Sequence, residues 1–142
     1  MAGGQLKDGT TLTSHFKVLE SDLASVVSPD PTDVHARVLA TPRVIAFMEM
    51  VSARMLVPHL APGQLSVGVK VDDMTHSAAT QVGKEVSVTA TFLRKEGKKF
   101  LFDVVAADGA GEIGKARHER AIVDEERLMS GARKRAAGGS KI

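Results

Sequence analysis

The sequence contains no cysteine, tryptophan or tyrosine. Without cysteine the chain has no disulfide framework, zinc ribbon, iron–sulfur cluster or thiol nucleophile, so any nucleophile is an oxygen or nitrogen atom. No apolar run approaches the roughly 18–20 residues that span a bilayer, and the N-terminal MAGGQLKDGTT lacks the apolar segment of a signal peptide. We therefore expect a soluble cytoplasmic protein with no membrane partner.

The chain has 142 residues, enough for one globular domain of about 100–150 residues but not for two. It is 43% hydrophobic and 25% charged, a balance that favours a folded domain over a disordered chain. The composition shifts near the C-terminus toward glycine, alanine and basic residues. We predict a single domain over residues 1–128 and a basic, flexible tail over residues 129–142.

The net charge of +2 comes from the C-terminus. Five basic residues and no acidic residue follow Glu126: Arg127, Arg133, Lys134, Arg135 and Lys141. Without those five, 14 of the 19 Lys and Arg residues remain against 17 Asp and Glu, so residues 1–126 carry a net charge of −3. Basic ends of this kind are usually solvated. A nucleic-acid-binding arm is the alternative, but it has no Trp or Tyr to stack on bases, and we expect no nucleic-acid partner.

A long buried helix is predicted between Thr41 and Pro58. Thr41 can cap the first free N–H groups of a helix, and the proline that follows it suits the first helical position because its missing N–H costs nothing there. Apolar residues then recur at helical spacing: Val44, Phe47, Met48, Val51 and Met55. Other apolar side chains cover the remaining faces, so we expect this helix at the centre of the core.

Most of the remaining chain alternates as β-strands do. Residues 12–20 and 34–40 alternate loosely and predict short strands or extended arms. Cleaner alternation predicts four further strands, at about residues 64–71, 85–93, 100–107 and 114–123. The last three are joined by short turns, which require an antiparallel arrangement. A long helix followed by an antiparallel sheet predicts an α+β fold.

Glu49 is unusual because it lies in AFMEMV, within the most hydrophobic helix of the chain. One interpretation is a residue at the edge of the domain whose carboxylate reaches water. The other is a carboxylate held in a low-dielectric site as a base, a nucleophile or a partner that orients a histidine.

Two further polar residues are candidates for chemistry. His76 lies in DDMTHSAATQVG between two predicted strands, and it is either a solvated loop residue or a proton carrier with room for a ligand beside it. Thr41 is first a helix cap, but a hydroxyl at a helix N-terminus also stands beside N–H groups that can hold an anion or a developing oxyanion.

Two other positions carry weaker signals. Gly68, in a valine-rich strand, is either a packing glycine or a place where a ligand approaches the backbone. Arg120 is either an exposed charge of the last strand or an anion clamp. The five histidines have no tight metal-ligand spacing, so we predict no metal site. Motifs of dinucleotide-binding, P-loop and α/β-hydrolase proteins are missing.

Four stretches, in this order, carry a family resemblance: ATPRVIAFMEMVSARMLVPHLAPG, SVG, THSAATQVGKEVSVTA and AADGAGEIGKARHERAIV. They place Thr41, Glu49 and His76 before the EIG…HERA block at close spacing. Over roughly residues 35–125 the chain therefore resembles the hot-dog thioesterases, and within them the fluoroacetyl-CoA thioesterase branch.

The resemblance implies a long central helix wrapped by an antiparallel sheet, and a homodimer with active sites at the subunit interface. It implies that Thr41, Glu49 and His76 are catalytic. It further implies that Gly68 and Arg120 contact the substrate. No separate cofactor is implied, since CoA is part of the substrate.

On this resemblance we expect hydrolysis of a short or small acyl-CoA to the free acid and CoA. His76 would carry protons as general base and acid. Glu49 would attack the thioester or orient His76 and water. Thr41 would position the acyl group or polarise its carbonyl.

The chain departs from the fluoroacetyl-CoA branch in two places. Thr32 and His35 stand where that branch has aromatic lid residues, which predicts no selectivity for fluoroacetyl groups. Gly68 and His76 are one residue further apart than in that branch, with the extra residue near positions 72–73. A β-bulge there would keep His76 directed at the pocket.

The main alternative is a hot-dog protein that binds acyl-CoA or another small ligand without catalysis, since one fold hosts different functions. The presence of Thr41, Glu49 and His76 together favours the enzyme. A hot-dog dehydratase or hydratase is a third possibility, but the predicted helix lacks an Asp/His motif of that type.

Overall fold

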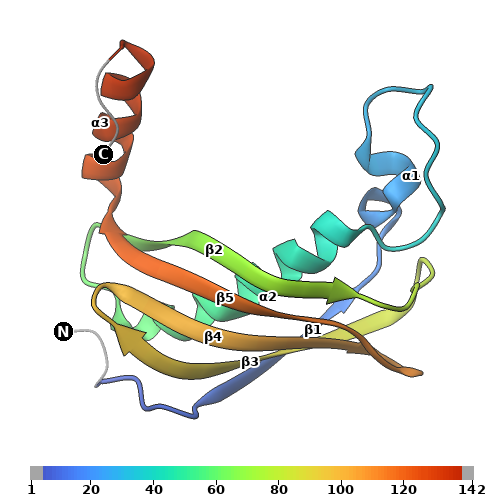
Figure 1. The fold of residues 1–142 in the computed structure, drawn as a ribbon, viewed down its shortest axis with the longest axis horizontal. Coiled ribbons are helices and arrows are strands. Elements are labelled where there is room, and N and C mark those ends of the chain that lie inside the picture. The colour runs from blue at the N-terminus through green and yellow to red at the C-terminus, as the bar shows by residue number, and fades with distance from the viewer. Residues whose placement is uncertain (1–4, 139–142) are drawn as a thin grey trace.

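The computed structural model describes residues 5–138, and it contains a five-stranded sheet and one long helix (Figure 1). In chain order the elements are β1 (Thr11–Lys17), η1 (Glu20–Asp22), α1 (Ala24–Val27), α2 (Thr41–Leu56), η2 (Val57–His59), β2 (Gln64–His76), β3 (Glu85–Glu96), β4 (Lys99–Asp108), β5 (Gly111–Asp124) and α3 (Glu125–Ala136). This set of elements confirms the predicted α+β fold. The last part of the predicted tail, residues 139–142, lies outside the described residues, as do residues 1–4.

The sheet is antiparallel throughout, with strand order β1-β3-β4-β5-β2. Strands β3, β4 and β5 form the predicted meander at its centre, and β1 and β2 are its edges. Residues 34–40 form no strand. Leu39 makes one isolated bridge to Leu23 and donates its N–H to the carbonyl of Thr80. Further backbone bonds join this segment to η1 and α1, so it is not held by the sheet.

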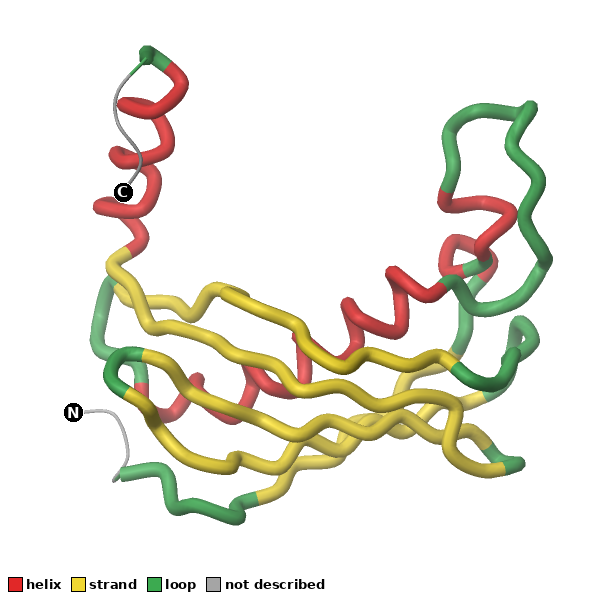
Figure 2. The backbone as a smooth tube through the Cα atoms, viewed as in Figure 1, coloured by secondary structure: helices red, strands yellow, loops and turns green. Residues whose placement is uncertain are grey.

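Helix α2 lies across one face of the curved sheet (Figure 2) and contacts all five strands. The five apolar residues whose spacing predicted this helix are all buried, as expected: Val44, Phe47, Met48, Val51 and Met55. Phe47 also stacks on Phe16 of β1, with ring centroids 4.4 Å apart. Packing of an apolar helix against the inner face of the sheet therefore supplies the core.

The start of α2 differs from the prediction. The N-cap residue is Ala40, no side chain caps the helix, and Thr41 is the first helical residue. The predicted capping role of Thr41 is therefore wrong. Its hydroxyl group instead forms a hydrogen bond with a side chain at the end of β2. That side chain competes with the backbone N–H groups of the helix for the Thr41 oxygen.

Strand β2 is irregular. Its register against β5 shifts between Gly68 and Lys70 and again between Asp72 and Thr75. Asp73, within the second shift, has a φ of 51°, a left-handed conformation that few non-glycine residues adopt. The second shift confirms the predicted bulge near positions 72–73.

Helix α3 extends from the end of β5, away from the sheet (Figure 2). Asp124 caps it by accepting the N–H of Arg127 at 3.0 Å. Acidic residues in its first turn and basic residues in its last turn complement the helix dipole. The helix buries none of its residues, and the predicted boundary after residue 128 falls inside it. Among residues 5–138, no helix has the length and apolar character needed to cross a membrane.

Candidate active site

Thr41 and His76 meet where the start of α2 approaches the end of β2. Thr41 Oγ1 and His76 Nδ1 are 2.7 Å apart, a hydrogen bond between residues 35 positions apart in the chain. Both line a pocket of about 320 Å³. Its other lining residues are small or aliphatic: Ala24, Val38, Leu39, Ala40, Ser77, Ala78 and Ala79. His76 thus has open space beside it, as the sequence interpretation of room for a ligand expects.

The second ring nitrogen of His76 is buried and has no hydrogen-bond partner among residues 5–138. A neutral imidazole has one N–H and one lone pair, and the partner of one nitrogen determines which form is present. When Nδ1–H donates to the Thr41 hydroxyl oxygen, Nε2 carries the lone pair. His76 is then arranged to take a proton at Nε2.

Glu49 lies two turns further along α2. Its side chain is 42% exposed, and its Oε2 lies 3.5 Å from Nη1 of Arg120 on β5. The carboxylate therefore reaches solvent, as the first sequence interpretation of Glu49 expects, and it also faces a cation. Arg120 itself is buried, at 7% exposure, so the interpretation of an exposed sheet charge is wrong.

Gly68 of β2 lies directly against Glu49. A Cβ atom built at this position would overlap Glu49 Oε2 and would touch the side chains of His118 and Arg120. Any other residue would therefore occupy the space of the carboxylate. Gly68 pairs with Arg120 across the β2–β5 ladder, which explains why one position contacts the whole group.

The guanidinium group of Arg120 is held by three hydrogen bonds. Its Nε donates to Ser66 Oγ at 2.9 Å, and its Nη2 donates to the Ser66 carbonyl at 3.0 Å. Its Nη1 lies 3.1 Å from Nε2 of His118. Burial lowers the pKa of Arg120 below its ordinary value, and nearby Glu49 opposes that shift.

His118 is a residue that the sequence analysis did not single out. It is only 1% exposed, and its Nδ1 lies 2.9 Å from the carbonyl of Lys70. Burial lowers the pKa of this imidazole, as does Arg120, while the Lys70 carbonyl and Glu49 oppose the change. Strand alternation was the available signal, since Ala116, His118 and Arg120 all face inward on β5.

The predicted site residues therefore form two groups rather than one. Thr41 contacts His76 at the start of α2, whereas Glu49 lies with Gly68 and Arg120 near its middle. Eight residues of helix separate Thr41 from Glu49, about 12 Å along its axis. In the described part of the chain, no hydrogen bond joins Glu49 to Thr41 or His76.

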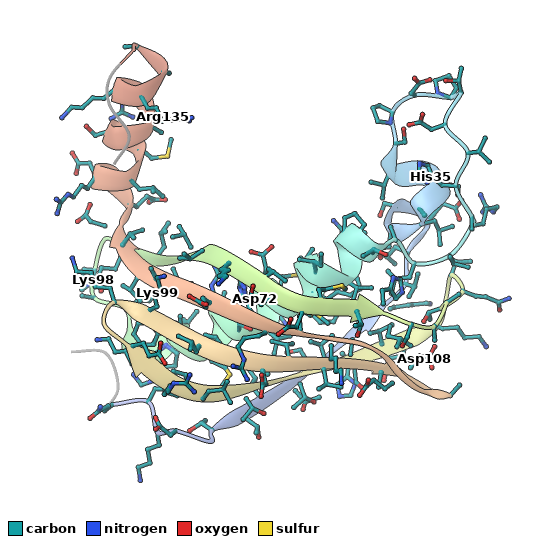
Figure 3. All side chains as sticks on the ribbon, in the orientation of Figure 1. His35, Asp72, Lys98, Lys99, Asp108 and Arg135 are labelled. Atoms are coloured by element: carbon teal, nitrogen blue, oxygen red, sulfur yellow. The ribbon has the colours of Figure 1, made fainter. Side chains whose placement is uncertain are left out.

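Thr32 and His35 lie on the loop between α1 and α2, which projects from the body of the molecule (Figure 3). Thr32 bonds to Asp30 through both its N–H and its hydroxyl group, and His35 is exposed. Neither residue lines the pocket of Thr41 and His76. Within residues 5–138, no three His, Asp or Glu side chains gather closely enough to hold a metal ion.

Sequence comparison relates the chain to one family. The model of the family described as fluoroacetyl-CoA-specific thioesterase (FlK) matches residues 18–126. The chain is 37% identical over 102 residues to the fluoroacetyl-CoA thioesterase of Streptantibioticus cattleyicolor, covering 72% of this chain and 73% of that protein. The matched segment includes all five predicted site residues.

Structural comparison also finds FlK, together with another protein of the same fold. A phenylalanine-to-alanine variant of FlK, in complex with fluoroacetate and CoA, superposes with a TM-score of 0.82 at 34% identity, over 87% of this chain and 99% of that one. A hot-dog-like protein from Thermanaerovibrio acidaminovorans superposes with a TM-score of 0.78 at 25% identity, over 90% and 91% of the two chains. The observed sheet and helix are thus those of the hot-dog fold, as predicted.

Proposed function

The chain belongs to the family of fluoroacetyl-CoA-specific thioesterases and is a thioester hydrolase that acts on acyl-CoA, and on this basis we propose that its substrates are short or small acyl-CoA molecules. The observation that carries the proposal is the pairing of Thr41 with His76 in a pocket lined by small residues. The pocket gives the acyl group a place beside His76, which supplies the proton carrier.

Hydrolysis of a thioester needs a proton to be removed from water and a proton to be supplied to the thiolate that leaves. In the proposed mechanism His76 Nε2 takes the proton of the attacking water as the new carbon–oxygen bond forms. The carbon–sulfur bond then breaks, and the same nitrogen returns the proton to the sulfur of CoA. In this mechanism His76 Nδ1–H donates to the Thr41 hydroxyl oxygen, which leaves the lone pair on Nε2.

Glu49 has two roles that are compatible with its position. In one, its carboxylate attacks the thioester carbon, CoA leaves with a proton from His76, and water deprotonated by His76 then hydrolyses the acyl–glutamyl anhydride to the free acid and Glu49. In the other, it orients the attacking water toward the thioester carbon. Arg120 places a cation 3.5 Å from the carboxylate in either case. Arg120 and Gly68 are proposed to contribute to the substrate site, consistent with their direct contact with Glu49.

The active unit is proposed to be a homodimer with its sites at the subunit interface. Strand β2 is an edge strand of 13 residues, so one side of its backbone is left for pairing with another strand. Val69 and Val71 are exposed along it. A second subunit beside β2 would lie next to Gly68 and His76, and would close the space around the two groups of site residues.

Selectivity for fluoroacetyl groups is not part of the proposal. The loop before α2 carries Thr32 and His35 at the positions where aromatic lid residues are expected, and neither side chain lines the Thr41–His76 pocket. We therefore propose comparable hydrolysis of acetyl-CoA and fluoroacetyl-CoA. CoA enters as part of the substrate, with no separate cofactor.

The proposal is tested by measuring thiol release from acetyl-, fluoroacetyl-, propionyl-, butyryl-, longer-chain and aryl-CoA. Wild-type protein should hydrolyse the short thioesters, and His76→Ala and Glu49→Gln should lose that activity. The matched control is His15→Ala, since His15 is an exposed histidine paired with Glu85 on the far edge of the sheet.

Two outcomes would change the conclusion. Preference for long or aryl chains would contradict the short-acyl substrate class. Complete inactivity of a folded protein whose melting temperature still rises with acyl-CoA would favour the non-catalytic binding protein.

A further inference from the structure

The inner face of β5 contains a histidine that the mechanism above does not use. Inward-facing positions of this sheet are mostly apolar, yet His118 is almost fully buried there, two residues before Arg120. A buried polar side chain is costly unless its hydrogen bonds are satisfied. Both ring nitrogens of His118 do have partners, Arg120 on one side and the Lys70 carbonyl on the other.

These two partners determine the tautomer of His118. Every nitrogen of a guanidinium group donates and none accepts, so Nη1 of Arg120 must donate to His118 Nε2. The proton of a neutral imidazole is then on Nδ1, where the Lys70 carbonyl accepts it. The neutral ring satisfies both bonds at once. A protonated ring would direct a second N–H at Arg120.

The contact with His118 controls the edge of the guanidinium group that faces Glu49. Ser66 accepts from Nε and Nη2 and fixes the opposite edge. Nη1 alone lies between His118 Nε2 and Glu49 Oε2. Without an acceptor at His118, a buried N–H of Nη1 loses its partner, and the group would have to turn to find another.

We propose that His118 is a positioning residue of the thioesterase site, which orients Arg120 and thereby sets the place of the Glu49 carboxylate against Gly68. The inference rests on the proposed function of Glu49. Within residues 5–138 the hydrogen bonds of His118 go to Lys70 and Arg120 and not to Thr41 or His76, so it acts through Arg120. Its neutral form matters because it alone provides the acceptor at Nε2.

Two substitutions separate this role from simple packing. A glutamine side chain reaches far enough to place its amide oxygen near the position of His118 Nε2, so His118→Gln keeps an acceptor for Arg120. An asparagine side chain reaches only to the position of Nδ1, so His118→Asn keeps the bond to Lys70 and loses the acceptor. A role limited to anchoring β5 on Lys70 would favour asparagine.

The experiment compares kcat and KM of wild type, His118→Gln and His118→Asn on the best short acyl-CoA. We expect His118→Asn to lower kcat by about 10-fold to 100-fold with little change in KM, and His118→Gln to keep most of the wild-type kcat. Equal losses in the two His118 variants would overturn the proposal.

A second measurement does not depend on activity. By NMR, the Arg120 Nη1 protons should exchange slowly with water in wild type and His118→Gln and faster in His118→Asn. Identical exchange in all three proteins would overturn the proposal, whereas an inactive wild type would overturn only the proposed function. If a variant does not fold, nitrogen NMR of wild type still tests the proposal, because it reports which ring nitrogen of His118 carries the proton. A proton on Nδ1 supports the proposal, and a proton on Nε2 contradicts it.

Discussion

Gly68 leaves the space that the Glu49 carboxylate occupies, and a Cβ atom there would overlap Glu49 Oε2. We expect Gly68→Ala to displace that carboxylate. Because the carboxylate is the end of a flexible side chain, the melting temperature should change little, while kcat/KM should fall by about 100-fold. Thioester hydrolysis measured beside a thermal melt tests both parts of this prediction.

The matched control is Gly109→Ala, because a Cβ atom at Gly109 would meet no atom within 4 Å. This variant should equal wild type in activity and melting temperature. Full activity of Gly68→Ala would mean that hydrolysis does not depend on where the Glu49 carboxylate lies.

Burial of His118 predicts a pH dependence of stability. Its pKa in the folded protein is lowered, chiefly by burial, from the ordinary value of 6.5. Below that value the unfolded chain takes up a proton at His118 before the folded chain does, so the free energy of unfolding falls as the pH drops. His118→Gln should remove this contribution.

Urea unfolding of both proteins at pH 7.5 and 5.5, chosen on either side of about 6.5, measures the effect. Wild type should lose more of its free energy of unfolding than His118→Gln does between these two values. Equal losses would show that His118 is not held neutral by the fold.

At the residue scale, local sequence drew attention to two of the candidate site residues. His76 stood out because of its small neighbours, and Glu49 because of its apolar surroundings. Two features depend on pairing between strands, which one sequence does not display. The burial of Arg120 against Ser66, and the bond of His118 to the Lys70 carbonyl, both require the register of β5 against β2.

At the scale of the element, the bulge in β2 places Asp73 in a backbone conformation that few non-glycine residues adopt. Its φ of 51° suits glycine and asparagine and strains a β-branched residue. We expect Asp73→Gly and Asp73→Asn to be at least as stable as wild type, and Asp73→Val to lose about 1–2 kcal/mol of unfolding free energy. Urea denaturation of wild type and the three variants measures their free energies of unfolding and thus their order of stability.

Thr75→Val serves as the comparison for this series, because Thr75 is an exposed residue of the same strand that pairs regularly with Lys115. It should be neutral or mildly stabilising, since valine favours extended backbone. A loss as large as that of Asp73→Val would assign the cost to the valine side chain rather than to the backbone of position 73.

Long periodic elements were predicted well and the connections between them were not. The apolar periodicity of α2 and the alternation of β3 depend on burial of a single face, which the sequence records directly. Residues 34–40 also alternate, but outside α2 their backbone bonds go to residues 22–25, around η1 and α1, and to Thr80. Those partners lie 11 to 41 positions away in the chain, beyond the reach of any local pattern.

At the scale of the whole molecule, the proposed homodimer predicts a particle of twice the 15.0 kDa chain mass in the analytical ultracentrifuge. Val69→Asp should shift the equilibrium toward the single chain, because it places a charge on the exposed edge strand β2. Hydrolysis should fall with dissociation, since the sites are proposed to lie at the interface.

Val105→Asp is the control, because Val105 is an exposed valine on the central strand β4, away from that edge. It should leave mass and activity unchanged. A wild-type protein that sediments as a single chain and still hydrolyses acyl-CoA would contradict the proposed dimeric site. Sequence alone suggested the dimer only through family resemblance, since no pattern within one chain records a second copy.

The bulge of β2 accommodates a residue between two regularly paired segments, so the ends of the strand stay in place when its length changes there. Relatives can therefore gain or lose one residue at this point during evolution and still keep the glycine against the glutamate and the histidine against the threonine. An alignment of such sequences should open its gap between Asp72 and Thr75. Counting residues forward from the glycine would otherwise assign the wrong position to the histidine.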